Sequence, residues 1–384
     1  MKKDIYIDYA SSTPTDPRIL KRFLPYYTEK FVNPSSSHFL GKIVKSEVED
    51  ARKKVAKFLN CSTDEIIFTS GGTESENLAI KGISFPVKKS GNHIIISNVE
   101  HTAVFSSADY LKKHGFDVTR ISVDKKCNIN FEELKKAIRD ETILVSVMYV
   151  NNEIGTIQPI VKIGAYIKQL NKTRTKQGKA IIRFHVDAEA ACFYLDCDVK
   201  KLNVDSMSIN GSKMYGIKGS GALFVKKGTP IATQITGGGQ ENYLRGGTTN
   251  VPAVVSLGYA CFFAQKERVL NNKKIIKLKK TLIDGIKKAI KNSQLNTPEN
   301  SVSNIVHFTF LGNKKDIVKE LSKKCIAVST GSACAANTKH KSHTLEAMGF
   351  SDEDIDSSIR FSFGKYNTLD DVKNVIQSLK TILQ

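Results

Sequence analysis

The stretch "EIIFTSGGTESENLAIKGI", residues 65–83, decides the fold. Residues 65–69 form a short, largely apolar run that predicts a buried strand. The glycines at 71 and 72 then turn the chain, and we expect a helix over residues 74–83. A strand that passes through a glycine turn into a helix is the unit from which α/β sheets are built.

The same alternation continues along the next 140 or so residues. Strands are predicted at 65–69, 93–97, 117–123, 143–150, 180–187, 204–209 and 221–225. Helices are predicted between several of them, at 74–83, 102–115 and 131–140. We therefore expect an α/β fold with a mostly parallel, seven-stranded sheet and helices on both faces. Such sheets bind ligands beyond the carboxyl ends of their strands.

After residue 251 the pattern changes to that of a smaller α+β domain. It predicts two long helices, then strands at 303–310, 325–330 and 358–363 with a helix between each pair and a final helix. We expect a large domain over residues 16–251 and a small domain over 252–384, with segment 1–15 packing on the small one. The helix from about residue 252 would bridge the two domains.

Composition indicates a globular protein of a reducing compartment. Of the 384 residues, 40% are hydrophobic and 25% charged, as in ordinary soluble domains. The longest apolar run, 251–264, contains Ser256 and Gly258, and neither a membrane span nor a signal or transit peptide is evident. The seven cysteines form no zinc-like or C-x-x-C pair. We expect a cytoplasmic protein without a metal site.

A net charge of +20 raises the question of nucleic acid. The densest basic segment, 273–292, carries apolar residues at helical spacing, so its lysines are expected on the solvated face of an amphipathic helix. No nucleic-acid motif accompanies them. An acidic partner protein or tRNA stays open as a partner.

Four features near strand ends suggest a binding site for a phosphorylated aldehyde. Gly71, Gly72 and Thr73 open a helix and offer backbone N–H groups to an anion, although taken alone a plain turn capped by Thr73 is the more common explanation. Asp187 ends a strand, where a carboxylate can either hold a protonated ring nitrogen or cap a following helix.

The other two features are a histidine and a lysine. His101 follows a strand and precedes a helix, so it is either a ring-stacking proton shuttle or an ordinary helix-start histidine. Lys213 lies among glycines and serines, so its amine could be desolvated and nucleophilic. Taken alone, a lysine whose amine reaches solvent is the more common case, and only the combination with the other features favours the nucleophile. Together the four match what pyridoxal phosphate requires.

Ten motifs in order then give a resemblance that spans nearly the whole chain. They are "YIDYASSTPTDPR", "FTSGGTESENLAIKG", "EHTAV", "VNNEIGTIQ", "HVDA", "GSKMYGIKGSGALFV", "GGGQEN", "RGGTTN", "STGSACAA" and "SSIRFSFG". The sequence resembles cysteine desulfurases of the NifS/IscS type, which are class V aminotransferase-family enzymes of pyridoxal-phosphate fold type I. The resemblance implies a homodimer that takes L-cysteine as substrate.

The resemblance also implies roles for individual residues. Lys213 would attach the cofactor through an imine, Asp187 would pair with its ring nitrogen, and His101 would stack on its ring and take part in catalysis. The remaining cofactor-binding residues would be Gly72, Thr73, Asn152, Asn210, Ser212 and, from a dimer mate, Thr248. Asn152 and Arg360 would bind the substrate, with Arg360 clamping its carboxylate.

Cys334 is the implied nucleophile that accepts sulfur as a persulfide. It lies among the small residues 331–336, as suits a mobile loop, and close to the basic stretch 339–341, which would lower its thiol pKa. The sulfur would pass to an iron–sulfur scaffold protein or to tRNA thiolation, and Cys334 would contact a nascent cluster in the first case.

Three positions depart from the family pattern. Ser212 stands where a histidine is usual, Ala190 where a glutamine is usual, and Asn242 where an arginine is usual. We expect all three to lie at the cofactor and to weaken its retention, because charge-assisted contacts are lost. Two alternatives follow: another lyase of this fold, acting on selenocysteine or a carbon–sulfur bond, or a non-catalytic basic relative.

Overall fold

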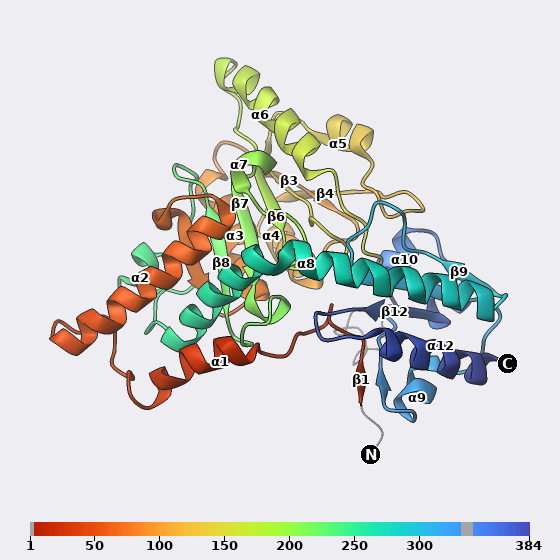
Figure 1. Ribbon diagram of the computed structural model, residues 1–384. Helices are drawn as coiled ribbons and strands as arrows, with labels where there is room; N and C mark the ends of the chain where they lie inside the picture. The colour runs from red at the N-terminus through yellow and green to blue at the C-terminus, as the bar shows by residue number, and fades with distance from the viewer. Residues whose placement is uncertain (1–3, 332–340) are drawn as a thin grey trace.

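The computed structural model describes residues 4–331 and 341–384. Cys334 and the basic stretch 339–340 therefore lie outside the described residues. A large sheet with its helices occupies one end of the molecule, a smaller sheet the other, and one long helix runs along both (Figure 1).

The large sheet confirms the predicted seven-stranded, mostly parallel architecture. Its order is β2-β8-β7-β6-β5-β3-β4, and only β8 runs antiparallel to its two neighbours. The strands are β2 (Ile66–Thr69), β3 (His93–Ser97), β4 (Asp117–Ile121), β5 (Thr142–Ser146), β6 (Arg183–Asp187), β7 (Ser206–Asn210) and β8 (Gly221–Val225). The parallel strands therefore end at one common edge.

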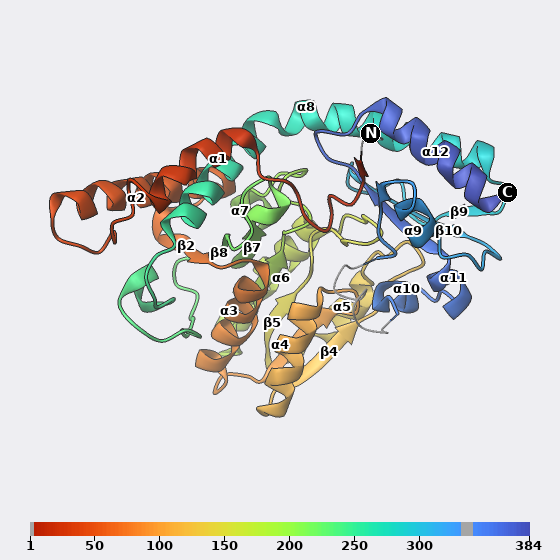
Figure 2. The same cartoon turned by 90° about the horizontal axis from the view of Figure 1, so that it is seen from below.

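Helices cover both faces of this sheet (Figure 2). On β3, Ile94 and Ile96 join a core cluster with side chains of α3 (Gly72–Ser84) and α4 (Thr102–Lys113). Ile95, which points the other way, belongs to the cluster that contains α6 (Ile160–Lys176). The remaining helices of this part are α1 (Pro17–Phe23), α2 (Phe39–Leu59), α5 (Phe131–Ala137) and α7 (Val199–Leu202).

The expectation of two long helices after residue 251 is wrong, because one helix, α8 (Val251–Ala289), runs for 39 residues. Pro252 lies in the first turn of α8, where a backbone N–H would have no partner within the helix, so its absence loses no hydrogen bond. The helix contains no second proline. Gly258 lets α8 approach α2 closely, since an added Cβ there would lie 2.8 Å from Ala51 Cα. Most lysines of 273–292 face solvent, as predicted, and Ile275, Leu278, Leu282 and Ile286 are buried. Lys279 is the exception, because its Nζ donates to Ser301 Oγ at 2.7 Å and to Val302 O at 2.9 Å.

The small part is built on an antiparallel sheet of order β12-β10-β9. Its strands are β9 (Ser293–Leu295), which was not predicted, β10 (Ile305–Phe310) and β12 (Ser358–Ser362). Its helices are α9 (Ile317–Ser322), α10 (His343–Ala347), α11 (Asp352–Asp356) and α12 (Leu369–Leu383), so two short helices stand where one was expected.

The N-terminal segment connects the two parts. β1 (Ile5–Tyr6) pairs with β11 (Ile326–Ala327), which is all that remains of the strand predicted at 325–330. Further along, Thr13 donates from both its backbone N–H and its hydroxyl to Ser212 O, at 2.9 Å each. The division at residues 251/252 stays a prediction.

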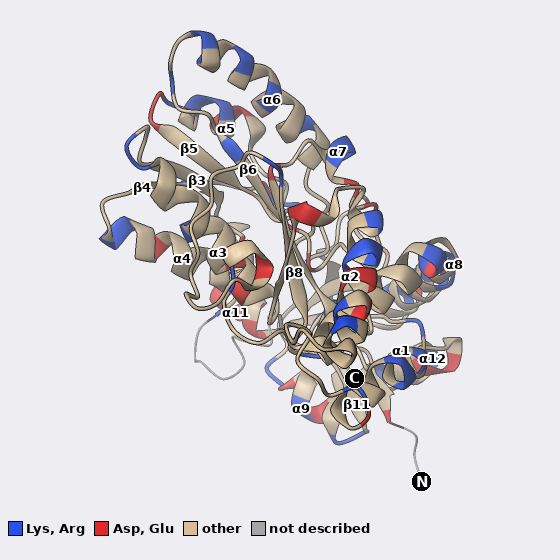
Figure 3. Cartoon of the chain, turned by 90° about the vertical axis from the view of Figure 1, so that its left-hand side faces the viewer, with Lys and Arg blue, Asp and Glu red and all other residues tan. Residues whose placement is uncertain are grey.

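Lysine and arginine residues recur along α2, α6 and α8 (Figure 3). Within the described residues, no helix combines the length and the apolar character that crossing a membrane requires.

Candidate active site

A cavity of about 330 Å³ opens where the parallel strands end. Asp187 and Asn210 are the last residues of β6 and β7, so the cavity lies at the edge where this kind of sheet binds ligands. Its lining residues are Ala10, Ser11, Ser70, Gly71, Gly72, Thr73, Glu74, His101, Met148, Val150, Asn152, Asp187, Glu189, Ala190, Asn210, Lys213 and Arg360. Eight of the residues singled out from the sequence are thus in one place.

Three other candidates are not among these lining residues. Ser212 is adjacent, and its backbone N–H and hydroxyl donate to Asn210 Oδ1 at 3.0 and 2.9 Å. Thr248 is exposed, and its role from a dimer mate stays a prediction. Cys334 lies outside the described residues.

The start of α3 forms the anion cradle. Gly71 precedes the helix with φ 147°, a conformation that favours glycine, and no side chain caps the helix there. The alternative that Thr73 caps the turn is wrong, because Thr73 lies inside α3. Free N–H groups and the helix dipole at this end favour a phosphate.

Asp187 is buried at the end of β6. Its Oδ1 accepts a hydrogen bond from Glu189 N at 2.9 Å, so it stabilises the turn after the strand. Burial, reinforced by the charges of Glu76 and Glu189, raises the pKa of the Asp187 carboxyl well above its usual range. A cationic ring nitrogen would reverse that shift by ion pairing.

Lys213 follows β7 in a single turn of 3₁₀ helix, over Gly211–Lys213. Its Nζ donates to Ala10 O at 2.9 Å and to Ser11 O at 2.6 Å. Burial lowers the pKa of this amine. The side chain therefore points into the site rather than snorkelling to solvent.

His101 is the N-cap of α4, where its Nδ1 accepts from Ala103 N at 3.2 Å. It is thus a helix-start histidine that also lines the cavity. Burial lowers the pKa of its imidazole, which favours the neutral form with the proton on Nε2.

Arg360 lies on β12 and is 1% exposed, although it belongs to the small part. Its Nη1 donates to Asn152 O at 2.9 Å and its Nη2 to Asp8 Oδ1 at 2.8 Å. Its Nε is buried and makes no hydrogen bond to any described residue. The guanidinium is therefore held in place by two of its five N–H groups, and the other three make no hydrogen bond to a described residue.

Sequence reasoning missed the acids around Asp187. The ligand atoms of Glu76, Asp187 and Glu189 all lie within 4.8 Å of one another. Glu76, on α3, accepts from Ser208 Oγ and lies 2.9 Å from His185 Nε2, and burial raises its carboxyl pKa. An acid two residues beyond Asp187 was the only available signal for Glu189.

Of the family departures, two concern this cavity. Ala190 lines it, and Ser212 is bonded to one of its lining residues. Asn242, in contrast, is exposed and lies in a separate pocket with Arg52 and Thr249. Asn242 therefore lies away from this chain's own cavity, and its expected place at the cofactor stays a prediction.

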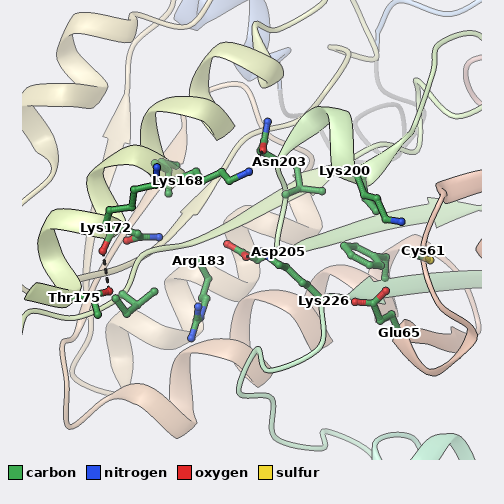
Figure 4. Close-up of a pocket in the computed structure, with 16 residues that line it drawn as sticks. Cys61, Glu65, Lys168, Lys172, Thr175, Arg183, Lys200, Asn203, Asp205 and Lys226 are labelled. Atoms are coloured by element: carbon green, nitrogen blue, oxygen red, sulfur yellow. Dashed lines mark hydrogen bonds and ion pairs between the residues drawn. The ribbon is translucent and has the colours of Figure 1, made fainter.

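A second cavity, of about 560 Å³, lies at the opposite edge of the sheet (Figure 4). Lys168, Lys172, Arg183, Lys200 and Lys226 line it, against the acids Glu65 and Asp205. Burial raises the pKa of its Cys61 thiol to about 12, so this thiol is a poor nucleophile. The chemistry expected from the sequence belongs to the other cavity.

Comparison with known proteins supports the chemistry expected of the cavity that contains Lys213. Residues 5–375 match the family model described as aminotransferase class V. The chain belongs to the class V aminotransferase family. The cysteine desulfurase IscS of Clostridium botulinum is 42% identical over 100% of this chain and 95% of the relative.

Two solved structures are also similar. A NifS-like protein superimposes with a TM-score of 0.92 at 35% identity and covers 99% of each chain. The structure titled "SspA in complex with cysteine" gives a TM-score of 0.81 at 33% identity, covering 95% of this chain and 100% of that one. These similarities establish a pyridoxal-phosphate-dependent class V fold.

Three features of the cavity fit that cofactor in charge and position. An uncapped helix start suits the phosphate, a buried carboxylate suits the ring nitrogen, and a desolvated lysine suits the aldehyde. One lining residue, Glu189, has the opposite chemistry, because its carboxylate lies over Gly72 at the start of α3.

Proposed function

We propose that this class V enzyme is a cysteine desulfurase, which converts L-cysteine to L-alanine and transfers the sulfur to the Cys334 thiol as a persulfide. The observation that carries the proposal is the meeting of Lys213, Asp187 and Arg360 in one cavity. Full-length similarity to the IscS of Clostridium botulinum supports the same reaction.

The cavity residues would divide the work as follows. Bound pyridoxal phosphate supplies an electron sink for the amino acid's α-carbon. Gly72, Thr73 and Asn210 would hold its phosphate, and Asp187 its ring nitrogen, with His101 against the ring.

The substrate would be held by the small part of the molecule. Arg360, whose guanidinium donates to Asp8 and to the carbonyl of Asn152, would bind the cysteine carboxylate with its remaining N–H groups. This fixes the α-carbon and the thiol relative to Lys213.

Lys213 would act as the base. Because burial lowers its pKa, the amine has an increased neutral fraction and can take the α-proton of cysteine. Cys334, as thiolate, would then attack the substrate sulfur, so that an S–S bond forms as the Cβ–S bond of cysteine breaks. The Cβ atom would take up a proton, and the α-carbon would regain the proton held by Lys213, to give alanine. The sulfur atom ends on Cys334, so each turnover converts one thiol to one persulfide.

The proposal also covers the oligomeric state of the protein and the acceptors of its sulfur. We propose a homodimer that supplies sulfur to an iron–sulfur scaffold protein or to tRNA thiolation in the cytoplasm. The relatives named IscS support a role in sulfur supply, and Thr248 from a dimer mate would complete the phosphate site.

The test is to incubate the protein with cysteine and pyridoxal phosphate and to measure alanine and the mass of the peptide that contains Cys334. A desulfurase gives alanine and a peptide heavier by one sulfur atom. Cys334→Ala should lose alanine formation from cysteine while its Lys213 still reacts with the cofactor. Unchanged activity in that variant would favour a lyase that needs no persulfide.

A further inference from the structure

Glu189 places a carboxylate in the anion cradle. It lies in the turn after β6, and its side chain reaches the first residue of α3. A Cβ added to Gly72 would lie 1.5 Å from Glu189 Oε1 and 2.3 Å from Oε2. The carboxylate therefore fills the space directly over the Gly72 backbone.

The same carboxylate also accepts a hydrogen bond from the side-chain amide of Asn210. Its Oε2 accepts from Asn210 Nδ2 at 2.8 Å, while Asn210 Oδ1 is bonded to Ser212. The Glu189 carboxylate thus occupies the space over Gly72 and accepts the hydrogen bond from Asn210 Nδ2. The cofactor's phosphate would need both of these positions.

The charge of Glu189 is partly offset at longer range by Lys213, since this carboxylate raises the pKa of the Lys213 amine against the lowering effect of burial. Within the described part of the chain Glu189 forms no ion pair within 4.0 Å, and its ligand atoms lie within 4.8 Å of those of Glu76 and Asp187. The basic groups that line the cavity are bonded elsewhere: Lys213 to two carbonyls, Arg360 to Asp8 and Asn152. A phosphate that arrives here meets an acid first.

We propose that Glu189 competes with the cofactor's phosphate for the Gly72 and Asn210 positions, so that the phosphate binds only by displacing this carboxylate. The inference rests on the proposed function, because it assumes that pyridoxal phosphate binds in this cavity. The aldehyde and ring, which meet Lys213 and Asp187, are not opposed in this way. Glu189 therefore reduces the advantage of pyridoxal phosphate over pyridoxal, which has no phosphate.

The experiment measures equilibrium binding of both compounds to cofactor-free protein, by the absorbance change on reaction with Lys213. The variants are Glu189→Gln, which keeps the size of the side chain, and Glu189→Ala, which removes it. Asp109→Asn is the matched control, because it also removes one negative charge, but from the exposed ion pair between Asp109 on α4 and Arg120 on β4. Thermal unfolding confirms that each variant is folded.

The proposal expects Glu189→Gln to tighten pyridoxal phosphate about tenfold or more, because like-charge repulsion ends and the contact that remains to Asn210 is no longer charge-assisted. Pyridoxal affinity should change less than about threefold, and Asp109→Asn should match the unmodified protein. Glu189→Ala should shift the two affinities in the same directions.

Two results would overturn the inference alone. One is equal affinity for pyridoxal phosphate in the unmodified protein and both Glu189 variants. The other is an equal gain for both compounds, which would place the effect of Glu189 on the ring. If no form of the protein reacts with either compound at Lys213, the proposed function fails as well.

Discussion

Asp8 Oδ1 lies 2.8 Å from Arg360 Nη2, which joins the N-terminal segment to β12 beside the cavity. The pair is well shielded, since the Arg360 side chain is 1% exposed and that of Asp8 16%. Asp8 therefore fixes the orientation of the guanidinium before any substrate arrives. The residue thought to bind substrate is held by segments that are distant in sequence.

Arg360→Lys should raise the KM for cysteine about 10- to 100-fold, with a smaller effect on kcat. Lysine keeps the charge but cannot hold Asp8, the Asn152 carbonyl and a carboxylate at the same time. Steady-state alanine formation at varied cysteine measures both constants. Asp8→Asn, which removes only the ion pair, should raise KM less, and a KM unchanged in Arg360→Lys would remove Arg360 from substrate binding.

Ser212→His combined with Ala190→Gln should tighten pyridoxal phosphate. Position 190 lines the cavity and position 212 is bonded to Asn210, so both new side chains start within reach of the site. Histidine adds a charge-assisted donor, and we expect a gain of about tenfold in affinity. Titration of cofactor-free protein measures it. An affinity no tighter than that of the starting protein would mean that these departures do not limit retention.

The cofactor-free protein should lose stability as the pH rises from 6.5 to 8. Burial raises the pKa of Glu100 from 4.5 to about 8, so the folded state retains a proton that the unfolded state has released. Stability therefore falls as pH rises through this window, by about 1.5 kcal/mol for one such group. Buried His185, whose pKa burial lowers to about 4, opposes the trend only below its ordinary value of 6.5.

Glu100→Gln tests this assignment. The amide resembles the protonated acid and keeps an acceptor for Ser97 Oγ and Met148 N, which bind Glu100 Oε1 at 2.5 and 2.9 Å. Urea unfolding at pH 6.5 and pH 8 should give a smaller loss of stability in the variant. The same loss in both proteins would mean that Glu100 is already ionised at pH 6.5.

Much of the fold was predictable from local patterns. The bounds of β3 and β8 agree with the sequence prediction to the residue, because both are short apolar runs with all five residues buried. The sequence prediction wrongly divided α8 into two helices. A helix that packs against α2 at one end and against α12 at the other tolerates polar residues in its middle, and such residues interrupt the apolar pattern.

The site was predictable where motifs carried it and not where side-chain direction decided it. Lys213, Asp187 and Arg360 were named from the sequence and line one cavity. Glu189 was not, because its effect depends on the turn after β6 and on the absence of a side chain at Gly72. Neither feature has a periodic pattern.

The most direct test of the account is to find which lysine binds the cofactor. The protein is mixed with pyridoxal phosphate, treated with borohydride to make the linkage permanent, and digested for peptide mass mapping. The account predicts a pyridoxyl-phosphate mass on the peptide that contains Lys213, and none in Lys213→Ala. The modification on a different lysine, or no modification, would contradict it.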